Sequence, residues 1–263
     1  MTLTVFASGS SGNCTLVSEG DTHLLIDDGI SFRRLSQALS RRGLTPGELS
    51  GVLITHEHND HISGIPMLSK HCGRPLFAPC ASALIMSRGD AGVEAYMHRI
   101  EQDAEFSLGA FRIRAFPTPH DAVCSVGYRL ESASGTLGYC TDCGSLTEEV
   151  LAGLSGCDAV VIEANHDEEM LRFGPYPVYL KRRILSERGH LSNENCGALA
   201  VSLAETGCSG FTLAHLSREN NRPELAYQAV RSALDGAGYS QRELTVAPVF
   251  GELCVEVSRQ CCV

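Results

Sequence analysis

The most informative stretch of the chain is Thr55-His56-Glu57-His58-Asn59-Asp60-His61. It directly follows the apolar run 52–54, which predicts a short buried strand, and Ile62 comes next. Three histidines and an aspartate within six residues are costly to remove from water, so they need strong partners. Such ligands suit Zn²⁺, Mn²⁺ or Fe, and a cluster this dense indicates more than one ion. The spacing differs from HExxH, which excludes a zincin protease.

Length and composition predict one large domain that spans residues 1–263. A chain of 263 residues is long for one domain and too short for two comfortable ones. A hydrophobic content of 43% with 20% charged residues is normal for a globular protein with a sizeable core. The formal net charge of −10 argues against a protein that coats nucleic acid through its global charge. It leaves room for a local basic patch.

The N-terminal sequence and the cysteines indicate a soluble, cytoplasmic protein. Residues 1–12 contain no basic stretch followed by an apolar core, so no signal peptide is visible. No apolar run approaches the ~20 residues needed to span a bilayer, so we expect no membrane contact. The 12 cysteines are then expected to be thiols. For the CxxC pair Cys140 and Cys143, buried small side chains are favoured over a redox or structural-zinc role.

Apolar patterning predicts a layered α/β (α+β) protein with mixed sheets. We expect strands at residues 2–6, 14–18, 23–26, 51–55, 75–78, 111–117, 124–130, 136–141, 159–163 and 210–214. We expect helices at residues 32–42, 65–71, 81–87, 178–188, 194–206 and 223–236. Residues 88–105 give no clear pattern.

The heptapeptide is an HxHxDH signature, and here the chain resembles the metallo-β-lactamase superfamily. The other motifs of that superfamily follow in order at residues 25–29, 119–121, 139–142 and 212–215. The resemblance implies a four-layer αββα sandwich with metals at one edge, where strand-end loops meet. The stretch between Asp142 and His215 is too short for a β-CASP insertion.

Carried over position by position, the resemblance implies a centre of two divalent ions, Zn or Mn, with Fe as a third candidate. One ion takes His56, His58 and His120. The other takes Asp60, His61 and His215, and Asp142 bridges the two. The paired ions would lower the pKa of a shared water and supply a hydroxide that attacks phosphorus, with Asp60 and Asp142 holding it.

Two further residues are assigned supporting roles beside the ligands. Asp27 is taken, in preference to Asp28, as the aspartate that braces the HxHxDH loop, because it directly follows a strand. His166 is assigned to the surroundings of the metals, with a purely structural role as the alternative. His166, His190 and His215 compete for the last ligand position, and His215 is preferred because it ends a strand and precedes Leu216-Ser217, as in the RNase Z branch.

In the same resemblance His190 precedes Leu191-Ser192 at the start of a helix. Its expected role is to donate a proton to the leaving oxygen, or to contact a phosphate at the helix N-terminus. A helix-terminal residue without chemistry is the alternative.

The closest likeness is to the YycJ/WalJ-type branch of metallo-β-lactamase-fold exonucleases. It is carried by residues 7–13, 55–64, 163–167, 179–193 and 213–221. Asp28 departs from the branch, where a small residue is common. The branch implies a DNA-directed phosphodiesterase, often a 5′ exonuclease, and with it a role in DNA repair.

Several polar residues are candidates for substrate contact. Arginine forks match phosphate oxygens, and a basic run precedes His190. A Gly/Ser-rich loop at residues 8–13 could offer backbone N–H groups to a phosphate. The candidates are Ser10, Asn13, Lys181, Arg182, Arg183 and Asn220. A solvated helix face is the alternative for the basic run.

We therefore predict a metal-dependent phosphodiesterase that acts on nucleic acid, DNA rather than RNA, with Asp60 and His190 as catalytic residues. A small-molecule hydrolase acting on a thioester, lactone or β-lactam would use the same metals and is the alternative. A di-iron oxygen or nitric-oxide reductase is disfavoured, because that branch has glutamate where this chain has His58. A non-catalytic relative would be expected to lack ligands, whereas all seven are present.

Overall fold

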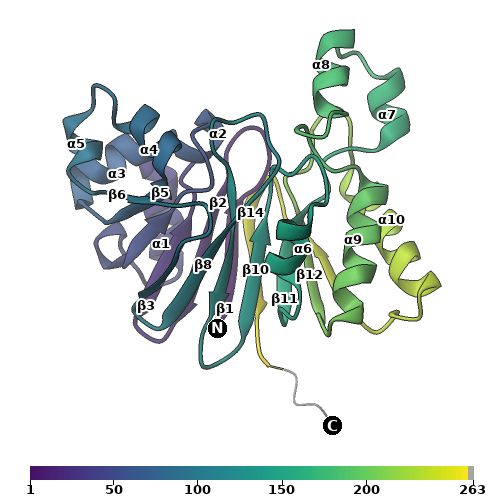
Figure 1. Cartoon of the computed structure of the whole chain (residues 1–263). Helices are drawn as coiled ribbons and strands as arrows, with labels where there is room; N and C mark the ends of the chain where they lie inside the picture. The colour runs from purple at the N-terminus through teal and green to yellow at the C-terminus, as the bar shows by residue number, and fades with distance from the viewer. Residues whose placement is uncertain (260–263) are drawn as a thin grey trace.

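Two seven-stranded sheets lie face to face in the computed structural model, which describes residues 1–259 (Figure 1). The first sheet consists, in spatial order, of β14 (Phe250–Glu256), β1 (Thr2–Ala7), β2 (Cys14–Glu19), β3 (Thr22–Ile26), β4 (Gly51–Leu53), β5 (Leu76–Pro79) and β6 (Met97–Ile100). The second consists of β13 (Glu243–Val246), β12 (Gly210–Ala214), β11 (Ala159–Glu163), β10 (Thr136–Cys140), β9 (Val126–Glu131), β8 (Phe111–Pro117) and β7 (Glu105–Leu108).

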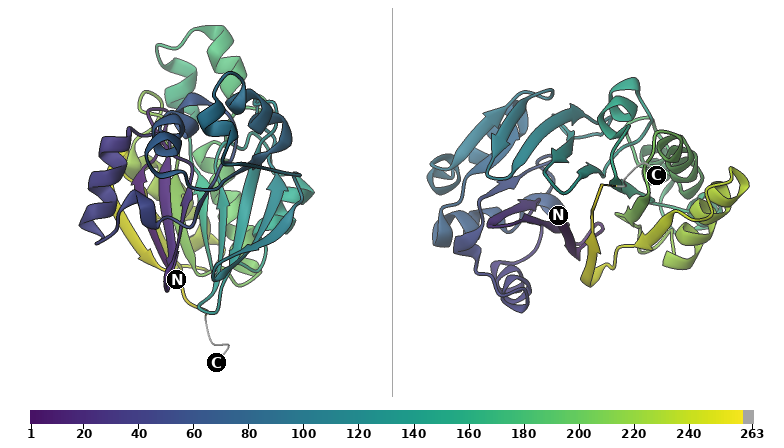
Figure 2. Two further views of the ribbon diagram at one scale, coloured as in Figure 1. Left: turned by 90° about the vertical axis from the view of Figure 1, so that its left-hand side faces the viewer. Right: turned by 90° about the horizontal axis from the view of Figure 1, so that it is seen from below.

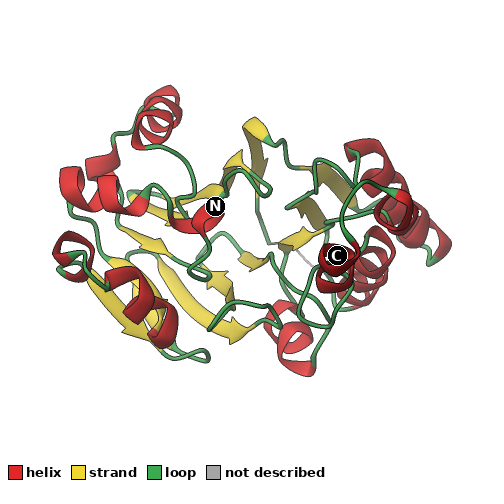
Figure 3. Cartoon of the chain, turned by 90° about the horizontal axis from the view of Figure 1, so that it is seen from above, coloured by secondary structure: helices red, strands yellow, loops and turns green. Residues whose placement is uncertain are grey.

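Helices cover the outer face of each sheet (Figure 3). The first sheet is covered by α1 (Phe32–Arg41), α3 (Ile65–Cys72), α4 (Cys80–Ser87) and α5 (Ala91–Glu94), with the single turns η1 (Pro46–Glu48) and α2 (Asn59–Ile62) in its loops. The second is covered by α6 (Glu148–Leu154), α9 (Asn193–Glu205) and α10 (Pro223–Gly236). The predicted four-layer αββα sandwich is confirmed. No helix within residues 1–259 combines the length and the apolar character that a membrane span requires.

Three apolar layers hold the sandwich together. Side chains such as Leu24, Phe111 and Tyr128 fill the space between the sheets, and both outer faces pack against their helices. Strands β4 and β11 are buried along their whole length, which explains their continuous apolar sequences. Full burial of each large side chain contributes about 1.5–3 kcal/mol to stability, so these layers keep the strand ends in place.

All the predicted strands and helices are present; the ranges 111–117, 159–163, 210–214 and 223–236 agree with the structure, and the other elements have shifted ends. The helix expected at residues 178–188 ends at Ile184, because the N–H groups of Gly189 and His190 bond back to the carbonyls of Ser186 and Ile184. A Cβ at Gly189 would lie 2.1 Å from the Ile184 oxygen, so this tight turn requires glycine. The elements η1, α2, α5, α6, α7 (Glu168–Phe173), β6, β7, β13 and β14 were not predicted.

Helices α7 (Glu168–Phe173) and α8 (Val178–Ile184) belong to neither helical layer. They project beyond one end of the sandwich in both side views (Figure 1, Figure 2). Strands β3 and β4 run parallel, as do β10, β11 and β12, and the loops at their carboxyl ends gather beneath this projection.

Candidate metal centre

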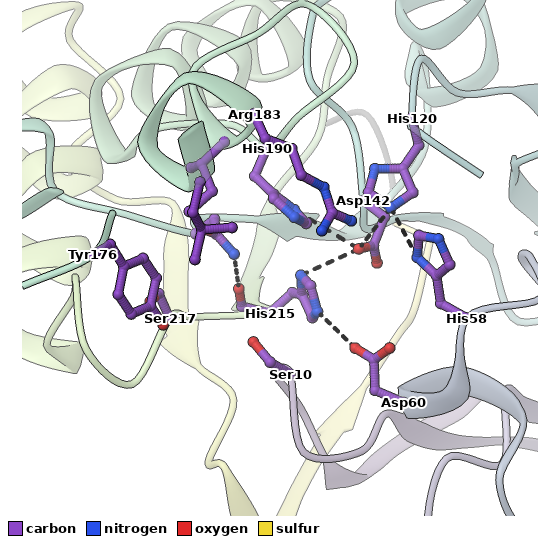
Figure 4. A pocket seen from close by; sticks show the side chains of 13 residues that line it. Ser10, His58, Asp60, His120, Asp142, Tyr176, Arg183, His190, His215 and Ser217 are labelled. Carbon is purple, nitrogen blue, oxygen red and sulfur yellow. Dashed lines mark hydrogen bonds and ion pairs between the residues drawn. The ribbon is translucent and has the colours of Figure 1, made fainter. Parts of the chain in front are cut away.

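All seven predicted ligands converge at this end of the sandwich (Figure 4). His56, His58, Asp60 and His61 follow β4, while His120, Asp142 and His215 follow β8, β10 and β12. Their donor atoms form sets within 4.8 Å of one another: His56, His58 and His120; Asp60, His61 and His215; His56, His61 and Asp142. The structure thus brings together residues separated by up to 159 positions (215 − 56 = 159).

The histidine set is arranged around a shared centre. Nδ1 of His58 lies 3.3 Å from Nε2 of His120, and the rings of His56 and His58 meet edge to face. Burial lowers the pKa of His56 and of His120, which favours neutral imidazole. Neutral imidazole is the form that binds a metal.

The second set places a carboxylate between two imidazoles. Oδ2 of Asp60 lies 3.6 Å from Nε2 of both His61 and His215. Burial alone would raise the pKa of Asp60, but the neighbouring His215 and His61 lower it to about 2. Asp60 is therefore ionised at neutral pH.

Asp142 lies between the two sets. One of its oxygens is 3.2 Å from Nε2 of His61, and the other is 3.6 Å from Nε2 of His120. Burial would raise the pKa of its carboxyl, but the charges of His215 and His61 hold that pKa well below the usual range. A carboxylate in contact with both sets has the position that a bridging ligand needs.

The donor atoms fit a divalent cation. Nε2 of His56, Oδ2 of Asp142 and Nε2 of His215 are buried without a hydrogen-bond partner among the described residues. Each such atom costs about 1–3 kcal/mol if it stays unpaired, so the arrangement calls for a group that these lone pairs can bind. Imidazole and carboxylate donors are the set that Zn²⁺ and similar ions prefer.

Three residues of the site have left-handed backbone conformations. Asp27, Asp142 and His215 have φ values of 60°, 56° and 55°, and within residues 1–259 they are the only non-glycine residues with positive φ. Each stands one or two residues beyond a strand. This conformation costs of order 1–3 kcal/mol per residue and turns the side chain sharply out of the strand direction toward the centre.

Asp27 supports the HxHxDH loop through contacts with two of its residues. Its Oδ2 lies 2.7 Å from Nδ1 of His61, and its Oδ1 accepts a hydrogen bond of 2.8 Å from the Thr55 N–H. The Thr55 hydroxyl also lies 3.0 Å from Nδ1 of His56. Asp28 makes none of these contacts: it is buried, and burial raises the pKa of its carboxyl to about 7.

Glu163 is a central residue that the sequence analysis did not single out. Its Oε1 lies 2.7 Å from Nδ1 of His190 and 2.8 Å from Nδ1 of His215. Its Oε2 accepts hydrogen bonds from the N–H groups of Cys143 and Leu191. Burial opposes ionisation, but His190 and His215 lower the pKa of Glu163 to about 2. The available signal was a carboxylate at the end of a wholly apolar strand.

Comparisons with known proteins agree with this geometry. A family model described as the β-lactamase superfamily domain matches residues 22–208. Exodeoxyribonuclease YycJ of Bacillus anthracis is 32% identical over 247 residues, which cover 91% of each chain. Exodeoxyribonuclease WalJ of Streptococcus pneumoniae is 35% identical over 233 residues, which cover 88% of this chain and 87% of that relative.

This chain belongs to the metallo-β-lactamase superfamily and is of the YycJ/WalJ type. The crystal structure of Zn²⁺-bound PqqB from Methylobacterium extorquens shares the fold, with a TM-score of 0.73 at 18% identity over 98% of this chain and 100% of that chain. Superfamily membership and the clustered His/Asp donors together make the chain a metal-dependent hydrolase.

In this YycJ/WalJ-type chain the ligands open into a cavity of about 260 Å³. His190 lies on its wall between the ligands and α8, and Ser10 and Arg183 face it from opposite sides (Figure 4). The guanidinium of Arg183 also pairs with Asp121. Tyr176 and Ser217 also line the cavity, and the sequence analysis proposed neither as a substrate contact.

Other predicted substrate contacts lie away from the cavity. The Asn13 amide lies behind the HxHxDH loop, 3.0 Å from Nε2 of His61. The ammonium of Lys181 donates to the carbonyls of Arg172 and Gly174. The Asn220 amide is buried near the Ser217 hydroxyl. None of the three residues lines the cavity, and the Lys181 ammonium is engaged within the chain, so we assign Lys181 a structural role.

Arg182, Arg188 and His166 have three different surroundings. Arg182 is exposed on α8. Arg188 donates to the carbonyls of His120 and Ala122 and so supports the loop that carries a ligand. His166 is buried outside the cavity, neither ring nitrogen has a hydrogen-bond partner within residues 1–259, and burial lowers its pKa to about 4.

Proposed function

We propose that this chain hydrolyses phosphodiester bonds of DNA from a 5′ end, with two divalent metal ions at the centre. The observation that carries this proposal is the position of His190. It faces the cavity beside the ligands and is hydrogen-bonded through Nδ1 to a buried carboxylate. Relatives named exodeoxyribonucleases support DNA as the substrate.

In the proposal, His56, His58 and His120 hold one ion. Asp60, His61 and His215 would hold the other, and Asp142 would contribute to both. Two such ions, when bound, lower the pKa of a shared water and stabilise the charge that develops on the phosphoryl oxygens. We propose zinc or manganese as the ions. We also propose that the enzyme is cytoplasmic.

The side chains of the cavity supply orientation and proton transfer. Asp60 is ionised and accepts a hydrogen bond from the attacking water, which aligns that water with phosphorus. Glu163 binds Nδ1 of His190, so Nε2 faces the cavity and holds the proton for the leaving oxygen. The glutamate also raises the pKa of His190 against the effect of burial, which favours the protonated donor.

Arg183 is the residue we propose for binding the phosphate. Its guanidinium lines the cavity from α8, and the Asp121 carboxylate with which it pairs lies 3.3 Å from Nε2 of His120 (Figure 4). Pairing with Asp121 orients the guanidinium before substrate binds, and a planar fork can bind a phosphate through two hydrogen bonds.

The decisive experiment follows nucleotide release from 5′- and 3′-labelled DNA and RNA, single- and double-stranded, after separate reconstitution with Zn²⁺ and Mn²⁺. We expect stepwise shortening of DNA from the 5′ end. Asp142→Ala, which removes the bridging ligand, is the control and should release nothing. Cleavage of RNA alone would transfer the proposal to a ribonuclease. Turnover of a thioester or lactone without cleavage of any nucleic acid would replace it with a small-molecule hydrolase.

A further inference from the structure

The projecting helices carry unusually exposed aromatic side chains. We call residues 168–184, which comprise α7, α8 and their connection, the arm. Phe173 is 86% exposed, Tyr179 is 74% exposed and Val178 is 65% exposed. Single exposed apolar residues are common on proteins, but three within seven positions on one projection form a local surface that is suited to a partner.

The arm holds these side chains in a defined position. The Asp167 carboxylate accepts a hydrogen bond from the Met170 N–H at the start of α7. The Lys181 ammonium donates to the carbonyls of Arg172 and Gly174 and so joins α8 to the end of α7. A Cβ at Gly174 would lie 2.5 Å from the Met170 oxygen, so the connection is closely packed. These contacts therefore fix the position of the two helices that carry the aromatic rings.

The same arm forms one wall of the metal cavity. Tyr176, Leu180 and Arg183 line the cavity, and Figure 4 shows the Tyr176 ring at the side opposite the His58 and His120 ligands. Phe173 and Tyr179 do not line the cavity and are exposed on the same arm. A strand that has one phosphate at the ligands and its sugar and base toward Tyr176 would continue from the cavity onto the arm.

We propose that the arm binds unpaired bases of the substrate strand next to the cavity, through stacking on Phe173 and Tyr179. This inference rests on the proposed function. Arg182, which is exposed and has no hydrogen-bond or ion-pair partner within residues 1–259, contacts a backbone phosphate of the same strand. Stacking suits an exonuclease, because every base offers a flat face whatever the sequence.

The net charge of the chain and the area of the exposed side chains favour a nucleic-acid strand over other partners of the arm. The chain carries a net charge of −10, so global attraction to a polyanion is weak, and stacking supplies affinity that salt does not screen. An aromatic side chain buries about 150–250 Å² at most, whereas a stable dimer buries about 800 Å² on each partner. The contact area of two rings and a valine is therefore sufficient to bind a few bases, but it is too small for a stable dimer with a second copy of the chain.

The test compares two 12-residue strands that have equal length and charge. One strand is oligothymidine, and the other is the same backbone without bases. Both have phosphorothioate linkages, which resist hydrolysis. Fluorescence anisotropy with the metal-loaded protein measures the dissociation constants. The double variant Phe173→Ala/Tyr179→Ala should bind the thymidine strand at least tenfold more weakly. It should bind the abasic strand as the unsubstituted protein does, because the abasic strand has no base to stack.

Two controls separate stacking from a general loss of structure. The double variant Phe173→Tyr/Tyr179→Phe keeps both rings and should keep the affinity. Leu84→Ala removes another exposed apolar side chain, 60% exposed on α4, and should also bind normally. Arg182→Ala should reduce the slope of log affinity against log salt by about 0.7, whereas the aromatic variants should leave that slope unchanged.

Hydrolysis of bis(p-nitrophenyl) phosphate separates the arm from the centre, because this small ester reaches the cavity alone. Phe173→Ala/Tyr179→Ala should hydrolyse it at the unsubstituted rate. Unchanged affinity for the thymidine strand would overturn the proposal for the arm. So would a loss of self-association or of binding to anionic vesicles while that affinity is kept. An unsubstituted protein that cleaves no nucleic acid would instead overturn the proposed function.

Discussion

Nδ1 of His190 lies 2.7 Å from Oε1 of Glu163, and that same oxygen lies 2.8 Å from Nδ1 of His215. One buried carboxylate therefore accepts a hydrogen bond from a proposed metal ligand and from a proposed proton donor. Both rings are left with Nε2 as the free nitrogen. Because the ligand and the donor share this anchor, a change at Glu163 should affect metal binding and proton transfer together, whereas a change at His190 should affect proton transfer alone.

Replacement of His190 tests whether a change at this residue affects proton transfer alone. His190→Ala should lower kcat on DNA by about 10²- to 10⁴-fold, because the leaving oxygen loses its proton donor. Metal content, measured by atomic emission after gel filtration, should stay at the unsubstituted level. His190 also lies in a potential ligand set with Asp142, Glu163 and His215, so a loss of metal in this variant would make His190 a ligand and refute its role as donor.

Replacement of Glu163 tests the shared anchor. Glu163→Gln keeps the size but removes the charge that orients both histidines, so metal affinity and kcat should each fall by about 10- to 100-fold. Titration with a fluorescent zinc chelator measures the affinity. Glu219→Gln, an exposed carboxylate four residues beyond His215, is the matched control and should change neither quantity. Normal metal affinity in Glu163→Gln would show that the hydrogen bond to His215 contributes nothing to binding.

Local sequence was sufficient to bring the HxHxDH residues together and to identify Asp27 as a support of their loop, but not to identify Glu163. His56, His58, Asp60 and His61 are close in the chain, so one loop after a buried strand brings them together. Glu163 meets His215 only because β11 and β12 pair in parallel with Glu163 opposite Ala214. In the sequence alone, a carboxylate at the end of an apolar strand is equally consistent with a buried support and with the start of a solvated turn. Only the position of the neighbouring strand distinguishes these two alternatives.

Residue type also gave no information on which polar groups the chain itself satisfies. Asn13 and Lys181 have suitable chemistry for a phosphate, yet their donors are engaged with His61 and with backbone carbonyls. Residues 88–105 were unreadable because α5 and β6 have four residues each, which is too short for a period to emerge. The edge strand β14 is largely exposed, and its apolar alternation is short, because only Leu253 and Val255 pack against the layer between the sheets.

The contact between Asp27 and His61 should be essential for folding of the loop. Both side chains are fully buried and 2.7 Å apart, so Asp27→Asn leaves the histidine without its carboxylate. Breaking such a buried pair costs about 3–5 kcal/mol, which urea unfolding of the metal-free protein measures as a lower midpoint with an unchanged slope. Asp21→Asn, at an exposed turn, is the control and should unfold like the unsubstituted protein. A loss below about 1 kcal/mol would mean that water replaces the pair.

The buried His166 ring should make the protein sensitive to mild acid. Burial lowers its pKa to about 4, whereas an unfolded histidine titrates near 6.5, at about the model-peptide value. Between these values the unfolded chain binds a proton that the folded chain does not, so this residue lowers the free energy of unfolding as the pH falls from 6.5 to 4. The full difference amounts to about 3 kcal/mol. Unfolding of metal-free His166→Gln and unsubstituted protein, measured by urea at pH 7.5 and pH 4.5, should therefore show the variant losing less stability than its parent. Parallel losses in the two proteins would mean that a water or a neighbouring group keeps His166 titrating normally in the folded state.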